Sequence, residues 1–134
     1  MLWQVASRAG WFAEHDPEKW PLWVAVDAAA ASTIAGWISL SPFYRRVAWD
    51  GTAEVSVYVS PAYQRCGIAR MLLRHAIATM GGFGKRKLMA IIYEHNVPSR
   101  ALFEAEGFVD WGRLPDVCDV DGTLRSVVIL GRDR

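Results

Sequence analysis

The alternation of apolar and polar residues along the chain predicts strands interleaved with helices. Residues 52–60 alternate between Ala or Val and polar or aromatic side chains, which is the period of a strand with one buried face. Residues 68–80 carry apolar side chains at every third or fourth position, as a helix with one buried stripe does. The chain therefore passes from a strand into a helix between residues 60 and 68.

The other segments extend this pattern. A short helix is expected over residues 7–14, and Asp16-Pro17 ends it because the residue before a proline is pushed out of the helical region. The order of elements predicts an α/β (α+β) fold, with a mixed central sheet flanked by helices, in one domain spanning residues 1–134. The remaining predicted elements are strands at 22–26, 33–40, 88–93, 108–111 and 124–130, and a helix at 98–106 closed by Gly107.

Composition restricts the class of protein. The formal net charge of the 134 residues is +1, which gives no electrostatic argument for a nucleic-acid or anionic-membrane partner. No apolar run approaches the roughly 20 residues that a membrane span needs, and the first residues lack the features of a signal peptide. Cys66 and Cys118 have no metal-ligand spacing. We therefore expect a soluble cytoplasmic protein with no metal, nucleic-acid or membrane partner.

The segment Gln64-Arg65-Cys66-Gly67-Ile68-Ala69 connects the strand at 52–60 to the helix at 68–80. The first N–H groups of a helix have no intrahelical acceptor, and the helix dipole favours negative charge at the same point. Gly67 permits a backbone conformation that a side chain would disfavour. An ordinary strand-to-helix loop fits the spacing as well, but the position between a strand and a helix favours a phosphate site.

Two other phosphate-binding motifs are absent from the sequence. No Gly-x-Gly-x-x-Gly follows the first strand, so a dinucleotide fold is disfavoured. In Gly84-Lys85-Arg86-Lys87, Arg86 stands where a Walker loop needs Ser or Thr. We interpret residues 84–87 as a solvated basic turn.

Gln64-x-x-Gly67-x-Ala69 resembles the acetyl-CoA signature of the GNAT superfamily of N-acetyltransferases. Residues 52–59 resemble the corresponding strand of the branch that acetylates phosphinothricin and methionine sulfoximine. Residues 96–103, with Glu106-Gly107-Phe108, are similar to that branch's Asn-x-x-Ser-x-x-Leu-His-x-x-Leu-Gly-Phe segment. The resemblance covers about residues 11–132, and the combination of segments is more specific than any one of them.

The resemblance implies acetyl-CoA as co-substrate. Its pyrophosphate would lie on backbone amides of the turn, its pantetheine arm would pair like an extra strand with the strand at 52–60, and Asn96 would contact it near the thioester. The implied cofactor-binding residues are Val57, Tyr58, Val59, Gln64, Arg65, Cys66, Gly67, Ile68, Ala69 and Asn96.

The implied reaction is direct attack of a primary amine on the thioester. Glu54 is the expected catalytic base, because it lies on the polar face of the strand and matches a glutamate of the branch; an ion pair with Arg45 or Arg46 is the alternative interpretation. A backbone N–H near Tyr58 is the expected oxyanion donor. The acid stays open, because Phe103 stands where relatives carry Tyr or His and cannot donate a proton. Tyr93 or a water could replace it.

Two departures from the branch affect the predicted function. Members usually begin with a further strand and helical region before the segment that matches Trp11, and we expect these to be missing here. The strand around Val24 would then be an exposed edge, which a second copy of the chain would cover, so we expect a homodimer. The acceptor is expected to be a small amino-acid-like amine of the phosphinothricin or methionine sulfoximine type. The alternatives are a shortened module that binds acyl-CoA with little turnover and a peptide or protein N-terminal acetyltransferase.

Overall fold

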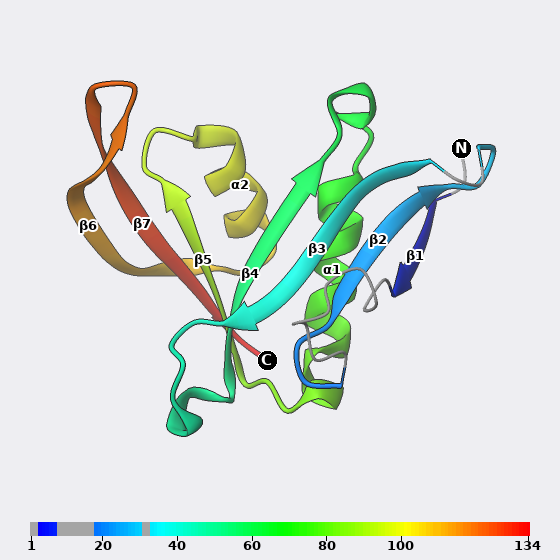
Figure 1. Cartoon of the computed structure of the whole chain (residues 1–134), viewed down its shortest axis with the longest axis horizontal. Helices are drawn as coiled ribbons and strands as arrows, with labels where there is room; N and C mark the ends of the chain where they lie inside the picture. The colour runs from blue at the N-terminus through cyan, green and yellow to red at the C-terminus, as the bar shows by residue number, and fades with distance from the viewer. Residues whose placement is uncertain (1–2, 8–17, 31–32) are drawn as a thin grey trace.

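A mixed sheet of seven strands forms the centre of the computed structural model, which describes residues 3–7, 18–30 and 33–134 (Figure 1). The strand order is β1-β2-β3-β4-β5-β7-β6, which confirms the predicted mixed α/β class. The strands are β1 (Trp3–Ser7), β2 (Leu22–Asp27), β3 (Ile34–Pro42), β4 (Thr52–Val59), β5 (Lys87–Tyr93), β6 (Val109–Val120) and β7 (Thr123–Asp133). The described α-helices are α1 (Ile68–Thr79) and α2 (Val97–Ala105).

The N-terminal expectation is wrong in one respect. The strand β1 precedes β2 and pairs with it antiparallel, from Trp3 opposite Asp27 to Ser7 opposite Trp23. The strand around Val24 therefore has a neighbour on each side and is not an edge. Apart from Ser7, which ends β1, the predicted helix at 7–14 lies outside the described residues.

The hydrophobic core lies between α1 and the sheet. The apolar stripe predicted for this helix is buried and packs against one face of the β2–β4 strands. Ala53 and Val55 are buried from β4, whereas Glu54 and Ser56 are only partly buried between them. The strict alternation in the sequence thus separates a core face from an accessible face, and Glu54 lies on the face opposite α1.

The sheet opens between β4 and β5. These two strands run parallel but pair at only three positions: Thr52 with Lys87, Ala53 with Leu88 and Glu54 with Met89. Beyond Glu54 the strands diverge (Figure 1), while β4 stays paired with β3 and β5 with β7. Most of β4 therefore has one free backbone edge that faces the opening.

Two local predictions need correction. The terminal strands are longer than periodicity indicated, because β6 and β7 form one long hairpin around the turn at Asp121-Gly122. The basic segment 84–87 is not a solvated turn. Lys85 is only 1% exposed, and its Nζ donates to the Asp50 carbonyl over 2.8 Å and lies 3.6 Å from the centre of the Trp20 ring. Its burial depends on residues distant in sequence.

Within the part of the chain that the structure describes, no helix is long and apolar enough to cross a membrane.

Candidate functional site

Two cavities lie along the free edge of β4. The first, here called the loop cavity, has a volume of about 340 Å³, and the second, the cleft cavity, about 190 Å³. The loop cavity is lined by Val59, Tyr63, Gln64, Arg65, Gly67, Ile68, Ala69, Arg70, Pro98 and Leu102. The cleft cavity is lined by Glu54, Val55, Ser56, Val57, Ala90, Ile91, Ile92, Ser99 and Phe103. Together they bring most of the sequence-predicted site residues to the opening beside β4.

The turn before α1 has the geometry of an anion site. The first N–H of this turn that bonds into the helix is that of Met71, which donates to the Gly67 carbonyl over 3.1 Å. Among the described residues, no backbone acceptor takes the N–H groups of residues 65 to 70. Six such donors beside a helix N-terminus suit the oxygens of a pyrophosphate, so the residues present fit the predicted ligand.

Two residues of the turn hold a left-handed backbone conformation. The φ angle is +77° at Gly67 and +64° at Arg65. A Cβ atom at Gly67 would meet nothing within 4 Å, so packing does not explain the glycine. Its backbone conformation does, because glycine adopts positive φ without the steric penalty of other residues. The space beside it is left open for a ligand.

A buried carboxylate anchors the segment just before the turn. The Tyr63 hydroxyl donates to Asp27 Oδ2 over 3.1 Å, and the Ala29 N–H donates to Asp27 Oδ1 over 2.9 Å. Burial, followed by the hydrogen bond to Asp27, raises the pKa of the Tyr63 hydroxyl. The ring of Tyr63 lines the loop cavity. This pair could not be predicted from the sequence, because the two residues are 36 positions apart and belong to no shared motif.

The backbone of β4 presents alternate peptide groups to the opening. The Ser60 N–H donates to the Ala35 carbonyl of the neighbouring β3 segment over 2.8 Å. Peptide groups alternate in direction along a strand, so Tyr58 points its N–H and C=O toward β3 as well. Val57 and Val59 then direct theirs toward the side from which β5 has diverged. The predicted donor near Tyr58 is therefore refined to these two neighbours.

Glu54 lies where β4 and β5 separate. It is the last β4 residue paired with β5 and lines the cleft cavity. Partial burial raises the pKa of its carboxyl group, which makes the carboxylate a stronger base. Within the described part of the chain it has no hydrogen-bond or ion-pair partner, so an ion pair with Arg45 or Arg46 is not observed.

Phe103 closes the base of the cleft cavity. It is 2% exposed and packs edge-on against Phe108, with ring centres 5.0 Å apart. Its ring supplies no proton donor. Tyr93, the alternative donor, ends β5, is exposed and lies beside His95 rather than in either cavity.

Three predicted site residues line neither cavity. Asn96 caps α2, where its Oδ1 accepts from the Ser99 N–H over 3.2 Å. The Tyr58 side chain points away from the opening and stacks on Trp37, its cross-strand neighbour. Cys66 is an exposed free thiol in the turn. For Cys66 only the backbone N–H lies where the cofactor was predicted, and the N–H and C=O of Tyr58 are directed to β3.

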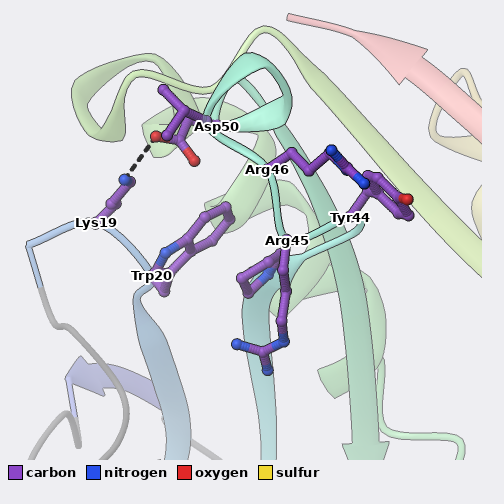
Figure 2. Close-up of a pocket in the computed structure, with 8 residues that line it drawn as sticks. Lys19, Trp20, Tyr44, Arg45, Arg46 and Asp50 are labelled. Carbon is purple, nitrogen blue, oxygen red and sulfur yellow. Dashed lines mark hydrogen bonds and ion pairs between the residues drawn. The ribbon is translucent and has the colours of Figure 1, made fainter.

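A third cavity, of about 240 Å³, lies at the end of β3 beside the loop that leads into β4 (Figure 2). Lys19 forms an ion pair with Asp50 over 2.7 Å. Arg46 lies 5.5 Å from the centre of the Tyr44 ring, and neither it nor Arg45 has a carboxylate partner among the described residues. The cavity thus carries uncompensated positive charge beside aromatic side chains, which suits an anionic group.

Comparison with known proteins agrees with this geometry. The model of the Acetyltransferase (GNAT) family matches residues 2–108. A Bacillus subtilis protein named "Putative phosphinothricin acetyltransferase YwnH" is 42% identical over 127 residues, which is 95% of this chain and 76% of that protein. The L-methionine sulfoximine/L-methionine sulfone acetyltransferase of Pseudomonas aeruginosa is 30% identical over 113 residues, 84% of this chain and 64% of its own length.

A solved structure extends the comparison to a bound cofactor. The phosphinothricin acetyltransferase of Sinorhizobium meliloti in complex with AcCoA superposes with a TM-score of 0.80 at 28% identity. The match covers 87% of this chain and 62% of that chain.

Proposed function

Since the chain belongs to the Acetyltransferase (GNAT) family, whose members use acetyl-CoA, we propose that it transfers the acetyl group to the primary amine of a small amino-acid-like molecule. The observation that carries the proposal is the position of Glu54. Its accessible carboxyl group has a raised pKa and lies where β4 loses its pairing with β5. From this residue onward β4 has a free backbone edge in the described structure, and that edge leads to the six unpaired N–H groups of the turn before α1.

The cofactor would be held mainly by backbone groups. The N–H groups of Arg65, Cys66, Gly67, Ile68 and Ala69 would take the pyrophosphate, with Gln64 at the edge of the same cavity. The pantetheine arm would add to the free edge of β4 along residues 57–59, bonding to the backbone groups of Val57 and Val59, which flank Tyr58. Asn96 would reach it with the amide nitrogen that helix capping leaves available. Acetyl-CoA supplies the activated acetyl group, and no metal is needed for this reaction.

The reaction requires a base for the ammonium proton and a hydrogen-bond donor for the thioester oxygen. Glu54 takes a proton from the acceptor ammonium, directly or through a water, so that the amine lone pair can attack the thioester carbon. The N–H of Val57 or Val59 stabilises the charge that develops on the thioester oxygen. A carbon–nitrogen bond forms and the carbon–sulfur bond breaks. The attacking nitrogen then loses its second proton, and the departing thiolate takes up one proton to give the coenzyme A thiol. The donor of that proton is not Phe103.

An acceptor that carries a carboxylate or a similar anion fits the charge near the site. The cavity at the end of β3 holds Arg45 and Arg46 without carboxylate partners among the described residues. Its lining residue Pro42 pairs with Ala53, the neighbour of Glu54. The proposal therefore agrees with the acceptors named for the Bacillus and Pseudomonas relatives, phosphinothricin and methionine sulfoximine.

The test is release of the coenzyme A thiol over a panel of amines. Glu54→Gln should lower kcat by roughly 10²- to 10⁴-fold, the usual contribution of a general base, while the thermal shift produced by acetyl-CoA stays close to that of the wild type. Glu104→Gln, an exposed substitution on α2, is the control for loss of a carboxylate elsewhere. Unaltered turnover in Glu54→Gln would remove this residue from the mechanism.

A second function has one specific observation in its favour. Phe103 leaves the cleft without the usual proton donor, as expected of a module that binds acyl-CoA with little turnover. A thermal shift with acetyl-CoA but no thiol release from any amine would support that alternative.

We also infer a cytoplasmic location, supported by the two free cysteines Cys66 and Cys118. A homodimer stays a prediction, and an exposed edge of β2 does not support it, because β1 pairs with that edge.

A further inference from the structure

Trp111 is the extra residue of a β-bulge. Asp110 pairs with Leu130 and Gly112 with Ile129, so β6 has one more residue than β7 at this point. A bulge changes the direction of the side chain at the extra residue, and bulges are over-represented beside active sites. The direction of the Trp111 indole therefore cannot be inferred from the alternation of residues along β6.

The indole lies against the backbone of Gly131. A Cβ atom on Gly131 would be 1.9 Å from Cε3 of Trp111 and 2.2 Å from Cδ2 and Cζ3. The ring thus occupies the space that any other side chain at position 131 would fill. Lys87 Nζ, from the next strand, lies 5.7 Å from the ring centre. These two contacts fix the ring above β7, near its pairing with β5.

This position is on the same face of the sheet as Glu54. Glu54 pairs with Met89, and Met89 pairs with Gly131. Side chains of residues opposite each other in neighbouring strands point to the same face. A Cβ atom on Gly131 would therefore point to the same face as the Glu54 side chain. Since the Trp111 indole occupies the space of that Cβ atom, the indole lies on this face too. Two strand spacings separate Gly131 from Glu54, or about 10 Å.

Met89 lies directly between the two residues, because it pairs with Glu54 on one side and with Gly131 on the other, and its half-buried side chain points to the same face. Ile91 follows Met89 by two residues on β5, so it also points to this face, and it lines the cleft cavity together with Glu54. Ile91 is 44% exposed and Trp111 is 42% exposed. Two large apolar side chains are thus left accessible beside a carboxylate with a raised pKa.

The geometry points to Trp111 as a specificity-determining residue. Its indole, with Met89 and Ile91, forms an apolar wall that receives the side chain of the acceptor when the amine lies at Glu54. The chain then prefers amino acids with an aromatic or branched aliphatic side chain over compact ones. This inference rests on the proposed function and names its substrate class. Apolar contacts of this kind discriminate by about 10- to 200-fold for each methylene group that they bury.

The experiment compares acceptors that share the α-amine and carboxylate and differ in the side chain. Thiol release is measured with phenylalanine, leucine, alanine, glycine and phosphinothricin. We expect kcat/KM for phenylalanine and leucine to exceed that for alanine and glycine by at least tenfold. Trp111→Ala should reduce this ratio at least tenfold and leave KM for acetyl-CoA and the rate with alanine unchanged.

Two further variants separate specificity from loss of folding. Gly131→Ala keeps Trp111 but places a methyl group in the space of its indole, so it should reduce the same ratio by displacing the ring. Leu124→Ala, at an exposed position near the tip of the same hairpin, is the control and should leave the ratio unchanged. The thermal shift with acetyl-CoA checks that each variant is folded. If Gly131→Ala does not fold, Trp111→Phe, which keeps a smaller ring, should give an intermediate ratio.

The outcomes distinguish the two proposals. Thiol release without preference for apolar side chains, or an equal effect of Trp111→Ala on all acceptors, overturns the specificity role and leaves the acetyltransferase function intact. Absence of thiol release with every amine overturns the proposed function, and the specificity role with it.

Discussion

Tyr63 and Asp27 connect the segment before the turn at residues 64–69 to the end of β2. The Tyr63 hydroxyl donates to a carboxylate oxygen of Asp27 over 3.1 Å, and Asp27 is only 8% exposed. The bond holds the short 3-10 turn Pro61–Tyr63 directly before the residues with left-handed backbone. It therefore supports the segment from which the turn begins, while the Tyr63 ring lines the loop cavity.

Removal of this hydroxyl should weaken cofactor binding more than catalysis. In Tyr63→Phe the ring remains in the loop cavity, but Asp27 loses a hydrogen bond. We expect KM for acetyl-CoA to rise about three- to tenfold, equivalent to about 1 kcal/mol, with kcat nearly unchanged. Steady-state kinetics check this split. Leu124→Ala, at an exposed position near the tip of the β6–β7 hairpin, is the control; a fall in kcat at constant KM in Tyr63→Phe would contradict the supporting role.

Gly67 should resist substitution because of its backbone. At φ +77° an alanine would be strained by about 1–2 kcal/mol, although its methyl group would meet no atom of the protein. We expect Gly67→Ala to lower the melting temperature by a few degrees and to weaken acetyl-CoA binding at least tenfold, as the methyl group enters the ligand space. Thermal-shift titration measures both. Gly82→Ala also meets no atom within 4 Å but has no positive φ, and it should have little effect.

The pH dependence of activity should reflect Glu54. The base acts only when deprotonated, and burial raises its pKa above the ordinary value of 4.5. The acidic limb of the profile of kcat/KM should therefore lie at higher pH than an exposed glutamate would place it, with activity rising as pH rises through that pKa. The limb should disappear in Glu54→Gln. If Glu54→Gln keeps the acidic limb of the wild type, the titrating group is a residue other than Glu54.

The stability that the contact between α1 and the end of α2 contributes should decrease as pH falls. Glu106 Oε1 accepts from Arg70 Nε over 2.9 Å and from Arg74 Nε over 3.1 Å. The hydrogen bond from Arg70, followed by that from Arg74, lowers the pKa of the Glu106 carboxyl group. A lowered folded-state pKa contributes stability that is present above the unfolded value, near 4.5, and is lost as pH falls through the folded value.

Glu106→Gln should therefore destabilise the protein at pH 7 by up to about 1 kcal/mol, because both arginines are more than half exposed and solvent screens the pairs. The difference from the wild type should shrink below pH 4.5. Urea unfolding at pH 7 and pH 4 measures it, and a difference independent of pH would exclude the ion pairs as its origin.

Much of the local structure could be predicted from periodicity. The alternation at 52–60 and the stripe at 68–80 predicted β4 (52–59) and α1 (68–79) to within a residue, since both patterns report burial of one face. The same patterns located the turn at 64–69 and put Glu54 on the accessible face. In contrast, the five residues of β1 were too short and too mixed in composition to be recognised, and their pairing with β2 supplies the neighbour that the sequence did not indicate.

By itself, the sequence determined which residues are available for chemistry: the carboxylate of Glu54, the glycine of the anion turn, and phenylalanine where a proton donor was expected. Only the tertiary structure decided what surrounds them. The divergence of β5 after Met89, the burial of Lys85 under Trp20 and the position of the Trp111 ring over Gly131 all depend on residues far apart in the chain. A periodic pattern shows which face of a single helix or strand is buried. The opening of a sheet and the direction of a bulged side chain are instead set by pairing between strands.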